Sequence, residues 1–144
     1  MQEHLDIVKK QFEKDSYAKS LGIVLDTLTD DTIQMHMQLR EDMLNMYNRP
    51  HGAIMYSLAD TAFSVLGNNK NNISVALDCS ITYHASPDPG TVLIVEGKTL
   101  SHSRKTAAFL FNIYMEKKGM RTLVATMKSV SYRTGKPIDP NAEQ

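Results

Sequence analysis

Hydrophobic residues recur along the chain with two different periods, which predict helices in two places and strands elsewhere. Leu5, Val8 and Phe12 follow helical spacing, so residues 1–15 are expected to contain a short amphipathic helix, over 3–15. The segment 53–66 repeats apolar residues at helical spacing and is nearly free of charge, which is typical of a helix buried on most of its circumference. Alternation with a period of two predicts six strands, at 23–28, 32–39, 73–84, 91–102, 107–116 and 122–132.

This order of elements predicts an α+β domain. Consecutive strands joined by short turns form antiparallel sheets, and one long apolar helix among six strands indicates a sheet wrapped around that helix. Residues 1–144 are expected to form one domain, and the polar segment 135–144 is expected to be a frayed tail. The strand 73–84 is predicted to place its apolar residues on one face, namely Ile73, Val75, Leu77, Cys79, Ile81 and Tyr83.

Composition narrows the classes of protein to which the chain could belong. Sixteen basic and sixteen acidic residues leave no net charge, which argues against a broad nucleic-acid-binding or polybasic membrane surface. Cys79 is the only cysteine, so no intrachain disulfide can form, and this fits a reducing compartment. The chain has no run of roughly 18 apolar residues and its start is too polar for a secretory signal, so a cytoplasmic location is expected.

Asp60 is the first candidate for chemistry, because it is the sole acidic group within the apolar helix predicted over 53–66. Burying an unpaired carboxylate is costly, so this side chain must reach solvent, a partner or a site. A narrow exposed edge of the helix would explain it equally well.

The start of the same helix is the second candidate. Backbone N–H groups in a first helical turn have no partner within the helix and lie at the positive end of its dipole, so they suit a developing oxyanion. Gly52 would let a ligand approach the backbone closely. The alternative is that His51 and Gly52 form only an entry turn.

Helix geometry constrains how these two candidates could act together. Gly52 and Asp60 are eight residues apart, which is roughly 12 Å along a helix axis. One reacting carbonyl cannot contact both residues of the same helix. Two antiparallel helices in a symmetric dimer could bring Gly52 of one chain to Asp60 of the other. If both residues are catalytic, the protein is therefore at least a dimer.

The stretch NMYNRPHGAIMYSLADTAF, residues 45–63, resembles the signature of PaaI-type thioesterases of the hotdog superfamily. That signature has an Asn, a His-Gly-Gly whose His follows six residues later, and a Leu-Ala-Asp whose Asp is nine residues after the His. Asn45, His51, Gly52 and Asp60 match at this spacing. The resemblance covers roughly residues 15–134 and implies a hotdog fold, acyl-coenzyme A hydrolysis, and homodimers that often pair into tetramers.

By this resemblance the Gly52 N–H would polarise the thioester carbonyl. Asp60 of the neighbouring subunit would act as general base on water or as nucleophile, and the sequence leaves both roles open. Asn45 would position the water or the thioester, and His51 would shape the loop. Thr61, Ser74, Arg104 and Lys105 are expected to contact the substrate.

Two positions depart from the family pattern. Ala53 replaces the second glycine of His-Gly-Gly, and we expect it to be helical, where alanine is favourable. Asn48 stands where relatives often have glycine, and asparagine tolerates the left-handed conformation better than most residues. Arg104 and Lys105 lie in a basic turn that suits the phosphates of coenzyme A, although a plain solvated turn would look the same.

No metal or cofactor is expected, because the histidines show no metal-ligand spacing with Cys79 or the carboxylates, and coenzyme A belongs to the substrate. A non-catalytic acyl-CoA-binding hotdog module is the main alternative function. A carboxylate facing the thioester distinguishes a hydrolase from such a module. A dehydratase acting on hydroxyacyl thioesters would need a His and acid pair at a different spacing, which the chain lacks.

Overall fold

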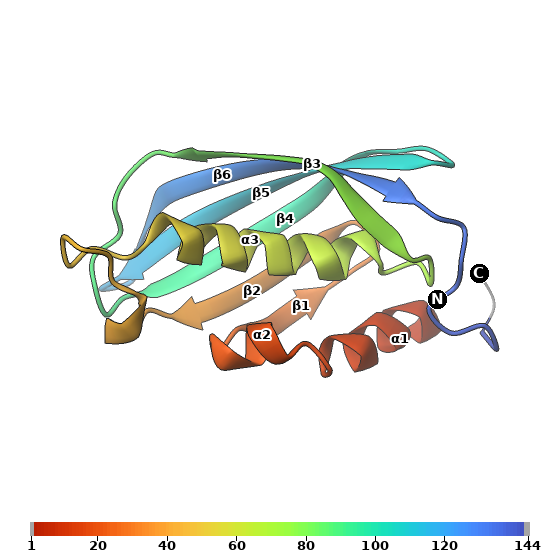
Figure 1. The fold of residues 1–144 in the computed structure, drawn as a ribbon, viewed down its shortest axis with the longest axis horizontal. Coiled ribbons are helices and arrows are strands. Elements are labelled where there is room, and N and C mark those ends of the chain that lie inside the picture. Colours follow the sequence, from red (N-terminus) through yellow and green to blue (C-terminus); the bar gives the residue numbers. More distant parts are fainter. Residues whose placement is uncertain (1, 143–144) are drawn as a thin grey trace.

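The computed structural model consists of one six-stranded antiparallel sheet that wraps around a long helix (Figure 1). It describes residues 2–142. The strands are β1 (Val24–Leu28), β2 (Thr32–Gln38), β3 (Ser74–Tyr83), β4 (Val92–His102), β5 (Thr106–Lys117) and β6 (Met120–Arg133). Their order across the sheet is β1-β2-β4-β5-β6-β3, so β1 and β3 form the two edges. The predicted α+β architecture is confirmed.

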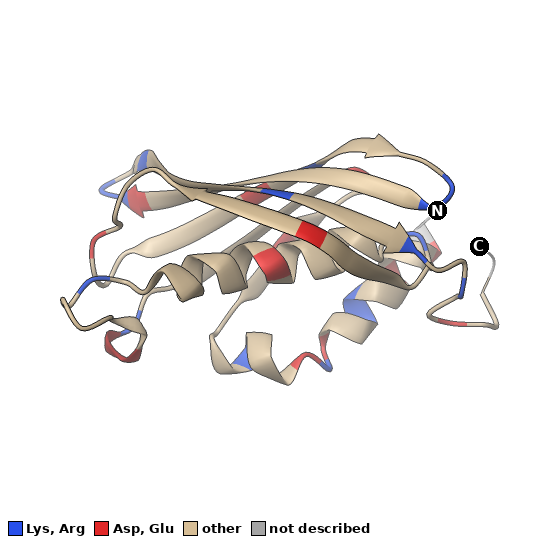
Figure 2. Cartoon of the chain, turned by 45° about the horizontal axis from the view of Figure 1, so that its top comes forward, with Lys and Arg blue, Asp and Glu red and all other residues tan. Residues whose placement is uncertain are grey.

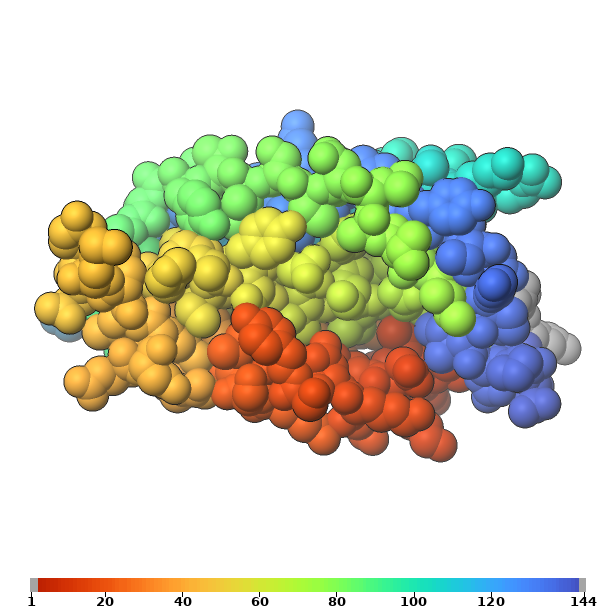
Figure 3. Space-filling view, viewed as in Figure 1, coloured from red at the N-terminus to blue at the C-terminus, as the bar shows by residue number. Residues whose placement is uncertain are grey.

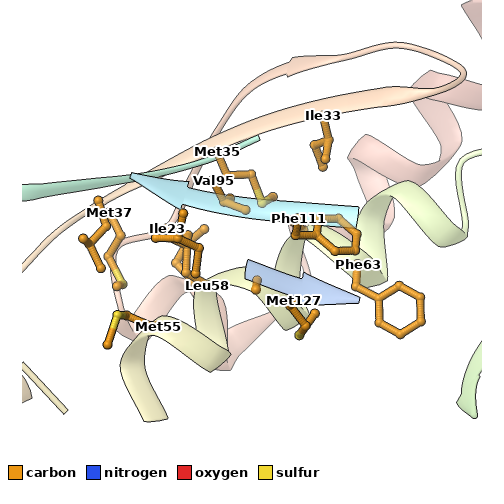
Figure 4. Close-up of a cluster of buried hydrophobic side chains, with 14 of the residues drawn as sticks. Ile23, Ile33, Met35, Met37, Met55, Leu58, Phe63, Val95, Phe111 and Met127 are labelled. Atoms are coloured by element: carbon orange, nitrogen blue, oxygen red, sulfur yellow. The ribbon is translucent and has the colours of Figure 1, made fainter. Parts of the chain in front are cut away.

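The central helix α3 (Gly52–Gly67) fills the concave side of the sheet. Leu58, Ala59 and Ala62 are completely buried, in agreement with the apolar periodicity of the sequence. Met35 and Phe111 of the sheet pack in the same cluster as Leu58 (Figure 4). Ala53 lies inside the first turn, so the expectation that it is helical is confirmed.

The N-terminal segment forms two helices, which corrects the prediction of a single helix over 3–15. Helix α1 (Gln2–Phe12) is followed by the short α2 (Ser16–Ser20). Asp15 separates them, because its backbone is extended and its carboxylate accepts a hydrogen bond from Ala18 N at 3.0 Å. This is an N-cap, which starts a new helix instead of continuing the old one. Val8 and Ala18 anchor the two helices in the core.

Strand β3 does not keep its apolar residues on one face, so that prediction is wrong. Its pairing with β6 shifts register between Ala76 and Asp78, which is the mark of a β-bulge. One extra residue reverses the alternation, so Ser74 turns toward the same side as Cys79. Val75 and Leu77 are left 49% and 59% exposed.

The segment after Gly135 is fixed more firmly than the predicted frayed tail. Lys136 O accepts a hydrogen bond from Ile73 N at 2.8 Å. The carboxamide of Asn71, which is fully buried, donates to Asp139 O at 3.0 Å and accepts from Asp139 N at 2.9 Å. These bonds hold the chain against the end of α3 as far as residue 139, and residues 143–144 lie outside the described part.

Gly97 allows the tightest packing in the sheet. It lies directly between Ile33 on β2 and Phe111 on β5 in the strand register. A Cβ at this position would lie 2.9 Å from Ile33 Cγ2 and would overlap the Phe111 ring. The ring of Phe111 in turn contacts Phe63 of α3, with centroids 6.0 Å apart. The missing side chain therefore lets the aromatic cluster lie under the helix.

We expect Gly97→Ala to lower the free energy of unfolding by about 1–3 kcal/mol, because Phe111 and Ile33 must both move to admit the methyl group. Chemical denaturation of wild type and variant measures this difference. Lys98→Ala is the matched control, because Lys98 is exposed on the same strand. Equal unfolding midpoints for Gly97→Ala and Lys98→Ala would contradict this account of the packing.

Candidate active site

The first turn of α3 presents a backbone N–H that lacks a protein partner. His51 is the N-cap, and its Nδ1 accepts the hydrogen bond of Ala53 N at 3.1 Å. Ile54 N donates to His51 O at 3.0 Å. Within residues 2–142, no acceptor takes the N–H of Gly52. His51 thus satisfies one group of the helix start, and the Gly52 N–H stays available to a ligand.

Tyr83 of β3 fixes the position of Gly52. Its hydroxyl donates a hydrogen bond to Gly52 O at 3.0 Å, and its ring packs so closely that a Cβ on Gly52 would lie 3.3 Å from it. The contact joins the helix start to the sheet. Both residues border a cavity of about 420 Å³, which Asn45 also lines.

Asn45 organises the loop that leads into α3. Its side-chain oxygen accepts hydrogen bonds from Tyr47 N at 2.8 Å and from Arg49 N at 3.2 Å. Asn48 adopts a φ of 59°, so the expected left-handed conformation is confirmed. The loop follows a short 3-10 helix, η1 (Glu41–Met43), and a bridge between Leu44 and Pro50 closes it. Because the Asn45 oxygen is engaged in the loop, only its NH₂ group can face a ligand.

Asp60 lies half-buried on the side of α3 that the sheet leaves open. It is the only charged residue of the helix (Figure 2), and α3 is visible at the surface between β3 and the N-terminal helices (Figure 3). Burial raises the pKa of the Asp60 carboxyl above its usual range, and the negative charge of Asp15 raises this pKa further. A carboxyl held in this way is a stronger base than an exposed one.

A small cavity of about 150 Å³ joins Asp60 to two serine hydroxyls, those of Ser74 and Ser131. Ser131 of β6 is only 1% exposed, and neither hydroxyl has a hydrogen-bond partner among the described residues. Buried hydroxyls without partners are costly, and a cavity of this size has room for water. The bulge in β3 is the reason that Ser74 reaches this cavity, as Ala76 does.

One chain does not bring the Gly52 and Asp60 sites together. The cavity at Gly52 and the cavity at Asp60 share no lining residue. The two residues belong to the same straight run of α3, eight positions apart. The structure therefore agrees with the helix arithmetic, because the two half-sites face separate cavities.

The structure places three of the expected substrate contacts, Thr61, Arg104 and Lys105, away from the Asp60 cavity. Thr61 is buried, and its hydroxyl donates to Ser57 O at 2.7 Å within the helix, so it does not line the Asp60 cavity. Arg104 and Lys105 are exposed in the turn between β4 and β5, at the opposite end of α3 from Gly52 (Figure 1). Lys105 O accepts a hydrogen bond from Arg133 N at 2.7 Å.

Two further positive groups, Lys70 and Arg133, lie at that end of the molecule. Together with His102 they border another cavity, near the C-terminus of α3. Burial lowers the pKa of His102, and the positive charges of Arg133 and Lys70 lower this pKa further. Among residues 2–142, no three His, Cys, Asp or Glu side chains are grouped so that they could hold a metal ion. No helix in the described chain is long and apolar enough to cross a membrane.

Sequence reasoning did not identify Tyr83, Ser131 or Asp15 as parts of the site. Ser131 carries a signal in hindsight, since Ser129 and Ser131 continue a core-facing row that begins with Ala125 and Met127. Serines at core positions of a strand suggest a polar cavity. Asp15 and Tyr83 carry no such signal, because their roles depend on contacts across the fold.

Comparisons with known families, sequences and structures all match this chain to esterases and thioesterases. The model of the thioesterase superfamily matches residues 47–122. A putative esterase from Archaeoglobus fulgidus is 31% identical over 109 residues, which are 76% of this chain and 69% of that protein. Acyl-coenzyme A thioesterase PaaI of Escherichia coli K12 is 28% identical over 131 residues, 91% of each chain. The structure of the E. coli PaaI protein from the phenylacetic acid degradation operon has a TM-score of 0.88 at 25% identity, covering 94% of this chain and 96% of that one.

The raised pKa of Asp60 predicts a pH-dependent effect on stability. A raised pKa in the folded state favours folding at low pH, and this contribution is lost as the pH rises through the folded-state pKa. We therefore expect Asp60→Asn to raise the melting temperature at neutral pH, with the gain disappearing in acid, where the wild-type carboxyl is protonated. Thermal unfolding across the acidic range measures this.

Asp31→Asn provides the control for that experiment, because Asp31 is an exposed acid in the turn between β1 and β2, at the opposite edge of the sheet from β3. An Asp60→Asn variant that is less stable than wild type at neutral pH would show that the carboxylate is stabilised in the fold and not strained by burial.

Proposed function

The chain belongs to the thioesterase superfamily and is a PaaI-like thioester hydrolase with the hotdog fold, and we propose that it hydrolyses small or medium acyl-CoA or aryl-acyl-CoA at a site shared by two subunits. The observation that carries the proposal is the half-buried Asp60 carboxylate, which faces a cavity with unpartnered hydroxyls. An acyl-CoA-binding module has no need of such a carboxylate. PaaI of E. coli, an acyl-coenzyme A thioesterase, aligns with 91% of this chain.

In the proposed reaction, Asp60 removes a proton from a water molecule held near Ser74 and Ser131, and that water attacks the thioester carbonyl carbon. The partner's Gly52 N–H donates to the oxygen that becomes negative, and the helix dipole adds to this stabilisation. The tetrahedral intermediate collapses to the free acid with loss of the coenzyme A thiolate, which takes up the proton that Asp60 removed from water. The unpartnered hydroxyls favour this route over direct attack by Asp60, because they supply partners for the water. No metal or redox cofactor enters these steps.

The shared site requires a homodimer, and the edge strand β3 supports one. An edge strand has free backbone N–H and C=O groups that can pair with another strand. The β3 edge also exposes the apolar side chains of Val75 and Leu77. Pairing of two β3 edges around a two-fold axis would extend the sheet and set two α3 helices antiparallel. Gly52 of one subunit would then approach Asp60 of the other.

Arg104 and Lys105 are proposed to meet the phosphates of coenzyme A. Their side chains form no ion pair among the described residues, and Lys70 and Arg133 add positive charge nearby. Guanidinium and ammonium groups are the usual phosphate partners in proteins. A cytoplasmic location is also proposed, since the single Cys79 suits a reducing compartment and coenzyme A esters are intracellular metabolites.

The activity test is release of free thiol from a panel of acyl-CoAs. We expect turnover by wild type, and a loss of about 10²–10⁴-fold for Asp60→Asn, because that is the usual contribution of a general base. Single turnover in ¹⁸O-labelled water places the label in the product acid if water attacks directly. Binding without thiol release from any acyl-CoA would instead establish the non-catalytic module.

A matched pair of variants tests the role of the Gly52 N–H. Gly52→Ala and Gly52→Pro both add a Cβ against Tyr83, but only proline removes the N–H. Proline is tolerated as the first residue of a helix, and the extended backbone of His51 suits a following proline. We expect Gly52→Pro to have a kcat about 10²–10³-fold below that of Gly52→Ala. Equal rates would remove this N–H from the mechanism.

Sharing of the site is tested with two inactive variants, Asp60→Asn and Gly52→Pro, co-expressed with different tags. A purified heterodimer would contain one site with both wild-type residues and one site with neither. We expect about half of the wild-type kcat per dimer, whereas each variant alone stays inactive. A heterodimer as inactive as its parents would mean that each site uses Gly52 and Asp60 of the same chain.

A further inference from the structure

A further cavity, of about 340 Å³, lies between α1, α3 and the C-terminal segment. Its apolar lining consists of Val8, Phe12, Val65, Ile73 and Ile138. Val8 and Val65 belong to the buried core, so the floor of the cavity is continuous with it. The proposed hydrolytic steps do not use this cavity, and its lining suits an apolar ligand.

This apolar cavity adjoins the cavity that contains Asp60. Ser64 and Asn68 line both of them. Asp60 and Ser64 of α3 and its C-cap Asn68 are spaced four residues apart, so they form one row along the helix surface. The row runs roughly 12 Å from the carboxylate toward the C-terminus of the helix. A group attached to a carbonyl at Asp60 can therefore extend along this row into the apolar cavity.

The walls of the apolar cavity are held in place by hydrogen bonds. The Asn71–Asp139 pair and the Ile73–Lys136 bond position Ile138 and Ile73 on one side. Asp15 lines the apolar cavity, and its negative charge also acts on Asp60 in the adjoining cavity. A carboxylate at the far end of the acyl group would be repelled by Asp15 there.

We propose that this cavity receives the acyl group, and that the enzyme prefers uncharged apolar acyl groups of medium length over acetyl and over acyl groups that end in a carboxylate. This inference rests on the proposed thioesterase function and adds its substrate preference. Each methylene that leaves water for the cavity is expected to raise kcat/KM about fourfold until the cavity is filled.

The chain-length profile tests the proposal. Wild type is assayed with acetyl-, butyryl-, hexanoyl-, octanoyl- and glutaryl-CoA. We expect kcat/KM to rise from acetyl to octanoyl and to be lower for glutaryl than for butyryl or hexanoyl. A profile that is flat, or highest for acetyl, overturns the proposal while leaving the thioesterase function intact. Absence of thiol release from every substrate overturns the proposed function instead.

A filling substitution tests the location. Gln11 is exposed on α1 and lines the cavity, so Gln11→Trp places a ring across it. Lys10→Trp is the matched control, because Lys10 is the exposed neighbour that does not line the cavity. We expect the octanoyl-to-acetyl ratio of kcat/KM to fall about tenfold for Gln11→Trp relative to Lys10→Trp. Equal ratios in the two variants, both with wild-type melting temperatures, would show that the acyl group binds elsewhere.

Discussion

The structure depends on the requirement that one helix be buried on most of its circumference by a sheet that cannot close around it. Leu58, Ala59 and Ala62 of α3 face the sheet and are fully buried. Six strands cover that side, and α1 and α2 cover part of the remainder. The uncovered strip of α3 is where Asp60 lies. The open side of the helix is thus a consequence of the architecture, and it is the place at which a ligand can reach the helix.

On that strip Asp60 carries a charged group that is half-buried, and this combination suits the proposed hydrolysis. A half-buried carboxylate next to Asp15 holds its proton more tightly than an exposed one, which makes it a better base. Ser74 and Ser131 leave buried hydroxyls without protein partners in the same cavity. Each of these features costs stability in the empty protein. The proposed water-activating site would account for their occurring together, since such a site needs a base and hydrogen-bond partners for the water.

The sequence predicted the elements well, because their apolar periodicity reports directly on burial. The predicted helix over 53–66 and the observed Gly52–Gly67 differ by one residue at each end. Contacts between distant segments were not predictable in this way. The face of β3 depends on its register with β6, and the split of the N-terminal helix depends on the cap at Asp15. The same holds for the candidate site. Gly52 and Asp60 were predicted from the local sequence pattern, whereas the position of Ser131 beside Asp60 could be seen only in the folded structure.

The bulge in β3 links the two parts of the proposed mechanism. It turns Ser74 and Ala76 toward the helix, where they line the Asp60 cavity together with Val75, and it leaves Val75 and Leu77 about half exposed at the edge of the sheet. A regular strand would keep one alternation throughout, and would turn Val75 instead of Ser74 toward the helix. The cavity beside Asp60 would then lose a hydroxyl, and the edge would lose apolar surface. One inserted residue therefore affects both the cavity beside Asp60 and the surface on which a second subunit is proposed to pair, so the proposed shared site and the proposed dimer depend on the same local irregularity.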